Sequence, residues 1–258
     1  IIAIVYNTIF IFSSDGEYRS QLEDSDINPE ISNSIIPKNH LDNKYYFVII
    51  FMKKIDEYTK TIIFNNYFFD STANTITSKG NYTFIPFNDA SNKKDLYPTF
   101  SCDIMKNNTQ EYIVCVYGTS NKFVVTVFNK DDYSVAATHE DPVGGHYLKC
   151  AILPDQREKG IFCGYKSSGS LYCFNYDITT NELNNKIKIN DSGCRDQPTA
   201  LNIQYFYETE QFVISCLVYE DNLCFLSQAN TQLIFVEINK GYSLIEDRKS
   251  GSAGMPRP

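Results

Sequence analysis

The stretch FSCDIMKNNTQEYIVCVYG, Phe100 to Gly118, holds two cysteines on either side of a polar break at residues 106–109. In an antiparallel hairpin, two residues face each other when the turn lies midway between them. The midpoint of Cys102 and Cys115 is 108.5, which falls inside that break. Facing residues of a hairpin can have the Cα separation that a disulfide requires. The stretch therefore predicts a β-hairpin that is closed by a disulfide.

A second stretch, LKCAILPDQREKGIFCGYK at residues 148–166, repeats this arrangement. Cys150 follows Cys102 by 48 residues, and Cys163 follows Cys115 by 48 residues as well. The midpoint of the second pair is 156.5, within the turn-like segment DQRE. A fixed offset of this length indicates a structural repeat.

Each repeat contains short runs of β-branched and aromatic residues, separated by Asn, Asp, Gly and Ser. Looser copies lie at residues 45–69 and after residue 198. A period of about 40 to 50 residues with four strands per unit is typical of β-propeller blades. We therefore expect an all-β protein, a β-propeller-like array of four-stranded blades with disulfides inside the blades. Tandem disulfide-bonded β-sandwich domains are the alternative. In the best-defined repeat, strands are expected at residues 99–105, 112–117, 123–128 and 133–138.

These repeats predict a single propeller-like domain at residues 1–248, followed by a flexible tail or linker at 249–258. Residues 1–12 are expected to form two strands with a turn at Asn7-Thr8, and the polar residues 17–39 a long loop. The expected units are a partial one at 1–42 and full ones at 43–96, 97–144, 145–197 and 198–248.

The cysteines favour disulfides over a zinc site, because their number is even and no C-x-x-C pair occurs. Disulfides imply an oxidising compartment, so we expect a secreted or cell-surface protein. Three N-glycosylation sequons, at Asn81, Asn107 and Asn190, lie in segments that look like polar turns. The expected disulfide pairs follow chain order: Cys102–Cys115, Cys150–Cys163, Cys173–Cys194 and Cys216–Cys224.

Charge and hydropathy exclude two classes of partner. The net charge of −8 opposes nucleic-acid binding, because an acidic surface repels phosphate. No apolar run has the roughly 18 residues of a membrane-spanning helix. We expect neither a cofactor nor a metal ion.

Two polar groups are candidates for a chemical site. His139-Glu140-Asp141, followed by His146, could ligate a metal ion or hold a general base, but polar residues are expected between two blades in any case. Residues 129–132, NKDD, could bind calcium weakly, but they lack the glycine and the final glutamate of an EF-hand loop. We interpret the first group as an inter-blade loop and the second as a hairpin tip.

A sialidase-like glycoside hydrolase is the enzymatic alternative. FSSDGEY, Phe12 to Tyr18, is similar to the sialidase Asp-box in Ser13 and Asp15, although the glycine comes one position early and the tryptophan is absent. Sialidases need three arginines at one site, whereas the turns that hold Arg157 and Arg195 are expected at opposite ends of a blade. The sequence also lacks a P-loop, a dinucleotide-binding fingerprint and a nucleophile elbow. We expect no catalytic residue.

The paired cysteines and FSSDGEY resemble those of secreted propellers from protists with A/T-rich genomes, such as the cysteine-rich protective antigen of malaria parasites. That resemblance implies a non-catalytic propeller that binds protein partners on a cell surface. We therefore expect a non-enzymatic extracellular protein-binding or scaffold module, which could belong to an adhesion or invasion complex. A structural subunit of a surface assembly would have the same sequence features.

Overall fold

A computed structural model describes residues 1–27, 33–54, 60–85, 100–118, 122–143, 146–165, 171–189, 198–206, 208, 211–220, 230–239 and 244–249. These residues form five antiparallel sheets, here named A to E. Sheet A contains β1 (Ile2–Val5), β2 (Thr8–Phe12) and β3 (Tyr18–Glu23). Sheet B contains β4 (Asn33–Leu41), β5 (Lys44–Lys54), β6 (Lys60–Asp70) and β7 (Thr75–Phe84). Sheet C contains β8 (Ser101–Lys106), β9 (Glu111–Gly118), β10 (Phe123–Asn129) and β11 (Val135–Asp141). Sheet D contains β12 (His146–Ile152), β13 (Lys159–Tyr165), β14 (Leu171–Asp177) and β15 (Glu182–Ile189). Sheet E contains β16 (Pro198–Phe206), β17 (Gln211–Glu220), β18 (Asn230–Asn239) and β19 (Leu244–Lys249).

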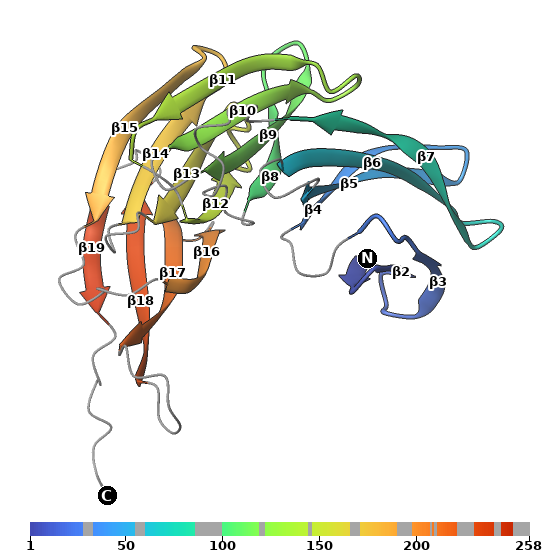
Figure 1. Cartoon of the computed structure of the whole chain (residues 1–258), viewed down its shortest axis with the longest axis horizontal. Helices are drawn as coiled ribbons and strands as arrows, with labels where there is room; N and C mark the ends of the chain where they lie inside the picture. Colours follow the sequence, from blue (N-terminus) through green and yellow to red (C-terminus); the bar gives the residue numbers. More distant parts are fainter. Residues whose placement is uncertain are drawn as a thin grey trace, which may run out of the picture.

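The sheets follow one another around an arc, with sheet A at one end and sheet E at the other (Figure 1). Every strand pairs with its neighbour in the sequence, so each sheet is an up-and-down meander. The first strands of sheets B to E, namely β4, β8, β12 and β16, contact one another in that order. They form the inner row of the arc. The expected fold class is confirmed: the chain is a β-propeller-like array of four-stranded blades.

Two expectations about the N-terminal residues are wrong. We placed the first unit at residues 1–42, but β4 pairs with β5 and belongs to sheet B. Residues 17–39 were expected to be a loop, yet they contain β3 and most of β4. Their polar residues alternate with only a few apolar ones, such as Leu22 and Ile36, so the period of a half-buried strand is weak. The predicted turn near residue 7 does connect two strands, and it begins at Tyr6, whose φ is +54°.

Aromatic side chains hold neighbouring sheets together. Phe64 of sheet B lies edge-on to Phe128 of sheet C, with ring centroids 4.9 Å apart. Phe123 of sheet C meets Phe174 of sheet D at 4.7 Å. All four rings are almost fully buried, and burial of each contributes about 1.5 to 3 kcal/mol. These aromatic contacts join sheet B to sheet C and sheet C to sheet D.

The disulfide that the opening stretch predicts is present. Cys102 of β8 pairs directly with Cys115 of β9, and their Cα atoms lie 4.1 Å apart. The β8–β9 turn is fixed by Asn107, whose Oδ1 accepts hydrogen bonds from the backbone amides of Thr109 and Gln110, both at 2.9 Å. The hairpin and its disulfide therefore form as the midpoint of the two cysteines indicates.

The predicted Cys150–Cys163 and Cys173–Cys194 disulfides are wrong. Cys163 of β13 is bonded to Cys173, which lies directly opposite on β14 with a Cα separation of 4.1 Å. Cys150 faces Phe162, and Lys149 faces Cys163, because the β12–β13 register is one residue away from the predicted one. A shift of one residue turns a side chain to the other face of the sheet. Cys150 and Cys163 therefore lie on opposite faces of sheet D.

Cys150 is a free thiol on the sheet C side of β12. Its Sγ lies 3.4 Å from Ser101 Oγ, and burial, aided by the nearby Asp103 carboxylate, raises its pKa to about 12. A neutral thiol is a poor nucleophile, so Cys150 acts as a packing residue. Cys194 and Cys224, and the side chain of Cys216, lie outside the described residues. The Cys216–Cys224 pair stays a prediction.

Candidate functional site

A cavity of about 840 Å³ lies between sheets A and B and is the best candidate for a binding site. We call it the A–B cavity. Sheet A contributes the start of β1, the end of β2, the β2–β3 turn and Arg19. Sheet B contributes the end of β4, the start of β5 and the end of β6. The lining side chains are apolar, aromatic, hydroxyl, amide or cationic: Ile1, Ile2, Ile11, Phe12, Ser13, Ser14, Arg19, Pro37, Lys38, Asn39, His40, Tyr45, Tyr46, Phe47, Phe69, Ser71 and Asn74.

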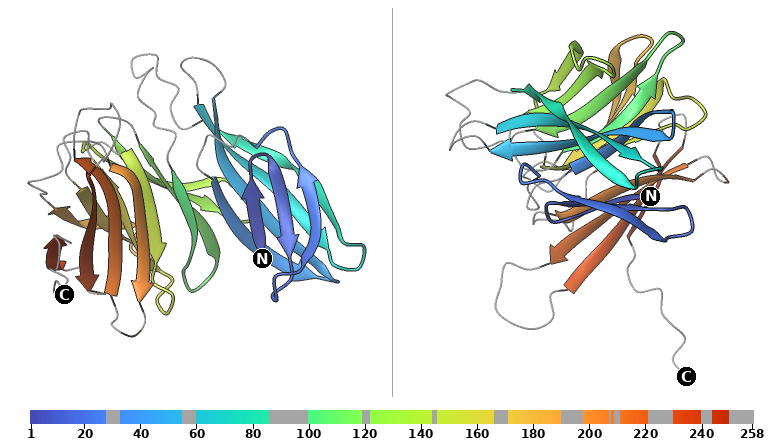
Figure 2. Two further views of the ribbon diagram at one scale, coloured as in Figure 1. Left: turned by 90° about the horizontal axis from the view of Figure 1, so that it is seen from below. Right: turned by 90° about the vertical axis from the view of Figure 1, so that its right-hand side faces the viewer.

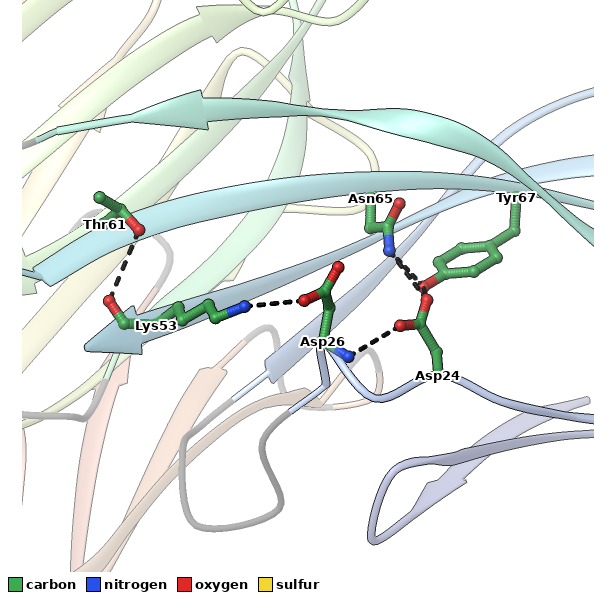
Figure 3. A network of polar contacts seen from close by, with 6 residues as sticks. All are labelled: Asp24, Asp26, Lys53, Thr61, Asn65 and Tyr67. Carbon is green, nitrogen blue, oxygen red and sulfur yellow. Dashed lines mark hydrogen bonds and ion pairs between the residues drawn. The ribbon is translucent and has the colours of Figure 1, made fainter. Parts of the chain in front are cut away.

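Sheet A is held in place by a polar network at the other end of its interface with sheet B (Figure 3). The Asp24 carboxylate accepts hydrogen bonds from the Tyr67 hydroxyl and from Asn65 Nδ2, the latter at 3.0 Å. It also accepts one from the backbone amide of Asp26 at 2.9 Å, and Lys53 Nζ lies 2.7 Å from the Asp26 carboxylate. We call these five residues the latch. Since the latch joins the turn after β3 to strands β5 and β6, it fixes the distance between the cavity walls.

Tyr67 connects the latch to the cavity. Its side chain is 1% exposed, and its ring stacks on that of Phe47, which lines the cavity, with centroids 5.5 Å apart. Burial is the main reason that the pKa of Tyr67 is raised, and the hydrogen bond to the Asp24 carboxylate adds to it. The hydroxyl therefore stays protonated and serves as a hydrogen-bond donor.

The Asp-box-like turn forms one rim of the cavity. Ser13 and Glu17 close it through a backbone hydrogen bond of 2.9 Å from the Ser13 amide to the Glu17 carbonyl. The Ser13 hydroxyl donates to the Asp15 carboxylate, which lowers the pKa of Asp15. Gly16 has φ +88°, a conformation that glycine adopts without strain. Ser13 and Asp15 thus stabilise the turn itself, and of the two only Ser13 lines the cavity.

The opposite rim is the β4–β5 hairpin. Its turn residues Asp42 and Asn43 both have positive φ, as a two-residue type I′ turn requires. Directly behind the turn, His40 and Tyr45 are cross-strand partners, and their rings stack with centroids 4.3 Å apart. Tyr45 remains 49% exposed, so its ring offers contact area to a ligand.

Lys38 supplies a cation that forms no direct ion pair among the described residues, although the nearby Asp131 carboxylate favours its charged form. Its Nζ donates to the Tyr133 hydroxyl at 3.1 Å and lies 4.7 Å from the centroid of that ring. None of the ion pairs of the described residues includes Lys38. Burial lowers its pKa more than nearby charges alter it. An anion that enters the cavity would offset this loss of hydration.

Arg19 is the second cation of the cavity, and it has a weak partner. It pairs with Glu17 at 3.1 Å, but the side chains are 43% and 66% exposed. Ion pairs at such exposure contribute little, so the Arg19 guanidinium can exchange this partner for another carboxylate. No Asp or Glu belongs to the described lining of the cavity. The site therefore favours acidic ligands with apolar or aromatic parts.

The polar groups that the sequence singled out elsewhere have structural partners. His139, Glu140 and Asp141 lie on β11 and contact Asn181, Lys122 and Lys186, respectively. No group of three or more potential metal ligands occurs in the described part of the chain. The NKDD segment is the β10–β11 hairpin tip, where the Asp132 carboxylate accepts from the Ser134 amide at 2.9 Å.

The remaining candidates are distributed over the array. Arg157 lies in the β12–β13 turn, 3.6 Å from a Glu111 oxygen, while Arg195 falls outside the described residues. Asn81 is exposed, but it lies on strand β7 and not in a turn as expected. Asn107 is in the β8–β9 turn, and Asn190 is not described. The A–B cavity itself was not predicted, because its walls come from segments that only the packing of sheet A on sheet B brings together.

Comparisons with known proteins give structural likeness alone. No family model matches the chain, and no curated protein matches it. The Dos1 propeller has a TM-score of 0.42 and 10% identity over 96% of this chain and 66% of its own. A levansucrase variant of B. megaterium has a TM-score of 0.44 and 10% identity over 96% of this chain and 78% of its own. This chain thus spans about two thirds of the Dos1 propeller structure.

Two further findings concern location. Both disulfides of the described residues lie within single sheets and are compatible with an oxidising compartment. Where the chain is described, it contains no helix of the length and hydropathy needed to cross a bilayer.

Proposed function

We propose that this protein is a non-enzymatic, extracellular or cell-surface binding module that holds a protein partner in the A–B cavity. The observation that carries the proposal is the lining of that cavity: exposed aromatic rings and two cations, with no carboxylate among the described lining residues. Large rings with polar tips and arginine are the side chains that dominate protein interfaces. Lys38 and Arg19 would then pair with acidic residues of the partner.

The same lining opposes the sialidase-like alternative. Glycoside hydrolysis in most families requires two carboxyl groups about 5 to 10 Å apart on either side of the scissile bond. The cavity offers no such pair among its described lining residues. Asp15, the residue shared with the Asp-box, is bound to Ser13 within its own turn. A binding role therefore agrees better than hydrolysis does with the side chains that line the cavity.

Affinity capture with two tryptophan variants tests the proposal. Asn39→Trp places a large ring in the cavity, and Thr77→Trp places the same ring on the exposed outer strand of the same sheet. We expect proteins of the extracellular fraction that bind the wild type and Thr77→Trp, but bind Asn39→Trp at least about tenfold more weakly. Equal capture by all three proteins would contradict binding in the cavity. Hydrolysis of a sialoside that Asn39→Trp abolishes would support the enzymatic alternative instead. If the protein captures only further copies of itself, that result would support its role as a structural subunit of a surface assembly.

A further inference from the structure

The turn end of sheet B extends past its neighbour, sheet C. Side chains two residues apart on a strand share a face of the sheet, so Phe68 lies on the same face as Phe64. Phe64 packs on Phe128 of sheet C, and the Tyr133 hydroxyl at the tip of the β10–β11 hairpin donates to Asn66 Oδ1. Phe68 lies two residues beyond Asn66 and does not belong to the described core between the two sheets. In Figure 1, the ends of β5, β6 and β7 that meet the β4–β5 and β6–β7 turns point away from sheet C.

Two lysines approach the ring of Phe68. Lys44 Nζ lies 5.4 Å and Lys79 Nζ lies 4.8 Å from the ring centroid. None of the ion pairs found in the described part of the chain includes either lysine. Two like charges at one ring repel each other, and an anion bound beside both would relieve that repulsion.

The neighbouring Asp70 carboxylate does not serve as that anion. Asp70 is the cross-strand partner of Lys44 and lies on the same face of sheet B. Its Oδ1 accepts hydrogen bonds from the backbone amides of Thr72 and Ala73, at 2.9 and 3.0 Å. The β6–β7 turn therefore engages this carboxylate, and both lysines stay available to a ligand.

Sheet D holds a similar pair of lysines, and there the chain supplies an anion. Lys186 Nζ and Lys188 Nζ lie 5.3 and 6.0 Å from the centroid of the Tyr172 ring. The Asp141 carboxylate, which comes from β11 of sheet C, lies 2.8 Å from Lys186 Nζ. No carboxylate takes this role beside Phe68 within the described ranges, so a bound ligand can supply the anion there.

The neighbours of the two lysines carry hydroxyl groups. Thr77 of β7 is the cross-strand partner of Phe68, and both Thr75 and Thr77 are exposed. Tyr46 lies on the other side of Phe68, with ring centroids 5.7 Å apart. Hydroxyl groups can exchange hydrogen bonds with a sugar, and an aromatic face offers a flat apolar surface to the C–H groups of a sugar ring. We call four residues of this surface the platform: Lys44, Phe68, Thr77 and Lys79.

We propose that the platform binds a sulfated glycan, with a sugar ring on Phe68 and sulfate groups beside Lys44 and Lys79. A sulfate half-ester carries a full negative charge on three oxygens, so one group can accept hydrogen bonds from both ammonium groups. The threonine hydroxyls favour a sugar over a protein segment, because the centre of a protein interface is mainly apolar. Thr77 and Lys79 do not belong to the described lining of the A–B cavity, so this ligand is separate from the protein partner of the cavity.

A heparin octasaccharide tests the proposal on the full chain. Its control is the same octasaccharide after chemical desulfation, which keeps the carboxylates. The net charge of −8 opposes non-specific binding of either saccharide. We expect binding of the sulfated form to be about tenfold tighter, with a slope of about −2 in a plot of log affinity against log salt concentration, because each lysine releases about one counterion.

The two saccharides also show what would refute a glycan site. Equal affinity for both, including no binding of either, would overturn the proposal. An octapeptide of glutamate that binds as tightly as the sulfated octasaccharide would overturn it as well, because the platform would then recognise an acidic protein segment.

Protein variants locate the binding. Lys44→Gln combined with Lys79→Gln removes both charges of the platform, and Lys188→Gln, which removes an exposed charge beside the Tyr172 ring, is the control. We expect the double variant to bind the sulfated octasaccharide about tenfold more weakly and to lose the salt dependence, while the control behaves like the wild type. An unchanged urea midpoint shows that the variants are folded. Unchanged affinity of the folded double variant would overturn the proposal.

Chemical acetylation maps the contact on the wild type. The sulfated octasaccharide should slow acetylation of Lys44 and Lys79 by acetic anhydride and leave Lys188 unaffected, as measured by peptide mass spectrometry. Equal protection of all three lysines would contradict a site at the platform.

The platform and the cavity can fail separately. Thr77→Trp covers the ring of Phe68, so it should weaken binding of the octasaccharide and leave capture of the protein partner unchanged. If the octasaccharide binds as expected but Asn39→Trp captures proteins like the wild type, the glycan site stands and the proposed function fails. If Asn39→Trp loses the partner but the double lysine variant keeps the octasaccharide, the glycan site fails and the proposed function stands.

Discussion

The latch between sheets A and B can be weakened by removing a single oxygen. Tyr67→Phe keeps the stacking on Phe47 and removes the hydroxyl that donates to the Asp24 carboxylate and accepts from Asn65 Nδ2 at 2.6 Å. A buried hydrogen bond to a charged group contributes about 1.5 to 3 kcal/mol. Asp24 keeps the hydrogen bonds from Asn65 and from the Asp26 amide, so the variant loses about 2 kcal/mol of stabilising free energy.

This loss of free energy weakens the packing of sheet A on sheet B. In repeat arrays each unit is stabilised mainly by its neighbours, so a terminal unit can open without the rest. A change of about 2 kcal/mol corresponds to an increase of about thirtyfold in the opening equilibrium. We therefore expect the amides of β2 near the buried Ile9 and Ile11 to exchange about thirtyfold faster in Tyr67→Phe, while those of sheet C are unchanged.

Hydrogen exchange with mass spectrometry measures both regions in one sample. Tyr18→Phe is the matched control, because Tyr18 is 57% exposed and lies at the start of β3, the end of that strand remote from Asp24. It should leave the exchange of both sheets as in the wild type. An equal increase in sheets A and C would refute local docking by the latch, and unchanged exchange in β2 would show that the Tyr67 hydroxyl does not hold sheet A.

Three more predictions follow from the disulfides, the buried tyrosines and the tightest glycine. Non-reducing peptide mapping should show Cys163 joined to Cys173 and Cys150 as a thiol; replacing the bonded pair by alanine should cost about 3 kcal/mol on the chain-entropy model, measured by urea unfolding. Burial raises the pKa of Tyr133 to about 12, and three other buried tyrosines are raised as well. This contribution to stability is complete below the ordinary pKa of tyrosine and is lost as the pH rises from there toward the raised pKa values, so the unfolding free energy should fall steeply above about pH 10. Tyr133→Phe should make that fall shallower, and an unchanged slope would contradict the assignment. Gly164→Ala would place a Cβ 2.5 Å from a Leu148 methyl and 3.2 Å from the Phe123 ring, so calorimetry should show a loss of about 1 to 3 kcal/mol.

Sequence patterns predicted the fold class and one hairpin in detail. The 48-residue offset places Cys102 and Cys150 on the first strands of sheets C and D, and Cys115 and Cys163 on the second strands. These segments are central and apolar, so their strand signals are strong. The expected strands of residues 97–144 agree with β8 to β11 within a few residues at each end.

The disulfide of sheet D shows the limit of such patterns. Strand positions follow from hydrophobic runs, but the register of a hairpin depends on the conformation of its turn. The β8–β9 turn is short and fixed by Asn107, whereas the β12–β13 turn spans residues 153–158. One residue of difference there left Cys150 opposite Phe162, while the β13–β14 pairing places Cys163 opposite Cys173. No residue type in the β12–β13 turn predicts the register of this hairpin.

The A–B cavity could not be predicted from the sequence for a different reason. FSSDGEY drew attention to its rim, but Lys38, His40 and Tyr45 lie in a part of the chain that was expected to be loop or a different unit. Their convergence depends on the contact between sheets A and B and on the latch at Tyr67.

Site-specific photo-cross-linking tests the central claim, that a protein partner binds between sheets A and B. A benzophenone amino acid in place of Tyr45, whose half-exposed ring lines the cavity, reports what enters it. The same amino acid at Thr77 on β7 is the control. We predict a cross-link from position 45 to a segment of the partner that contains acidic residues, and none from position 77. A partner cross-linked from position 77 alone, or equally from both, would contradict the account.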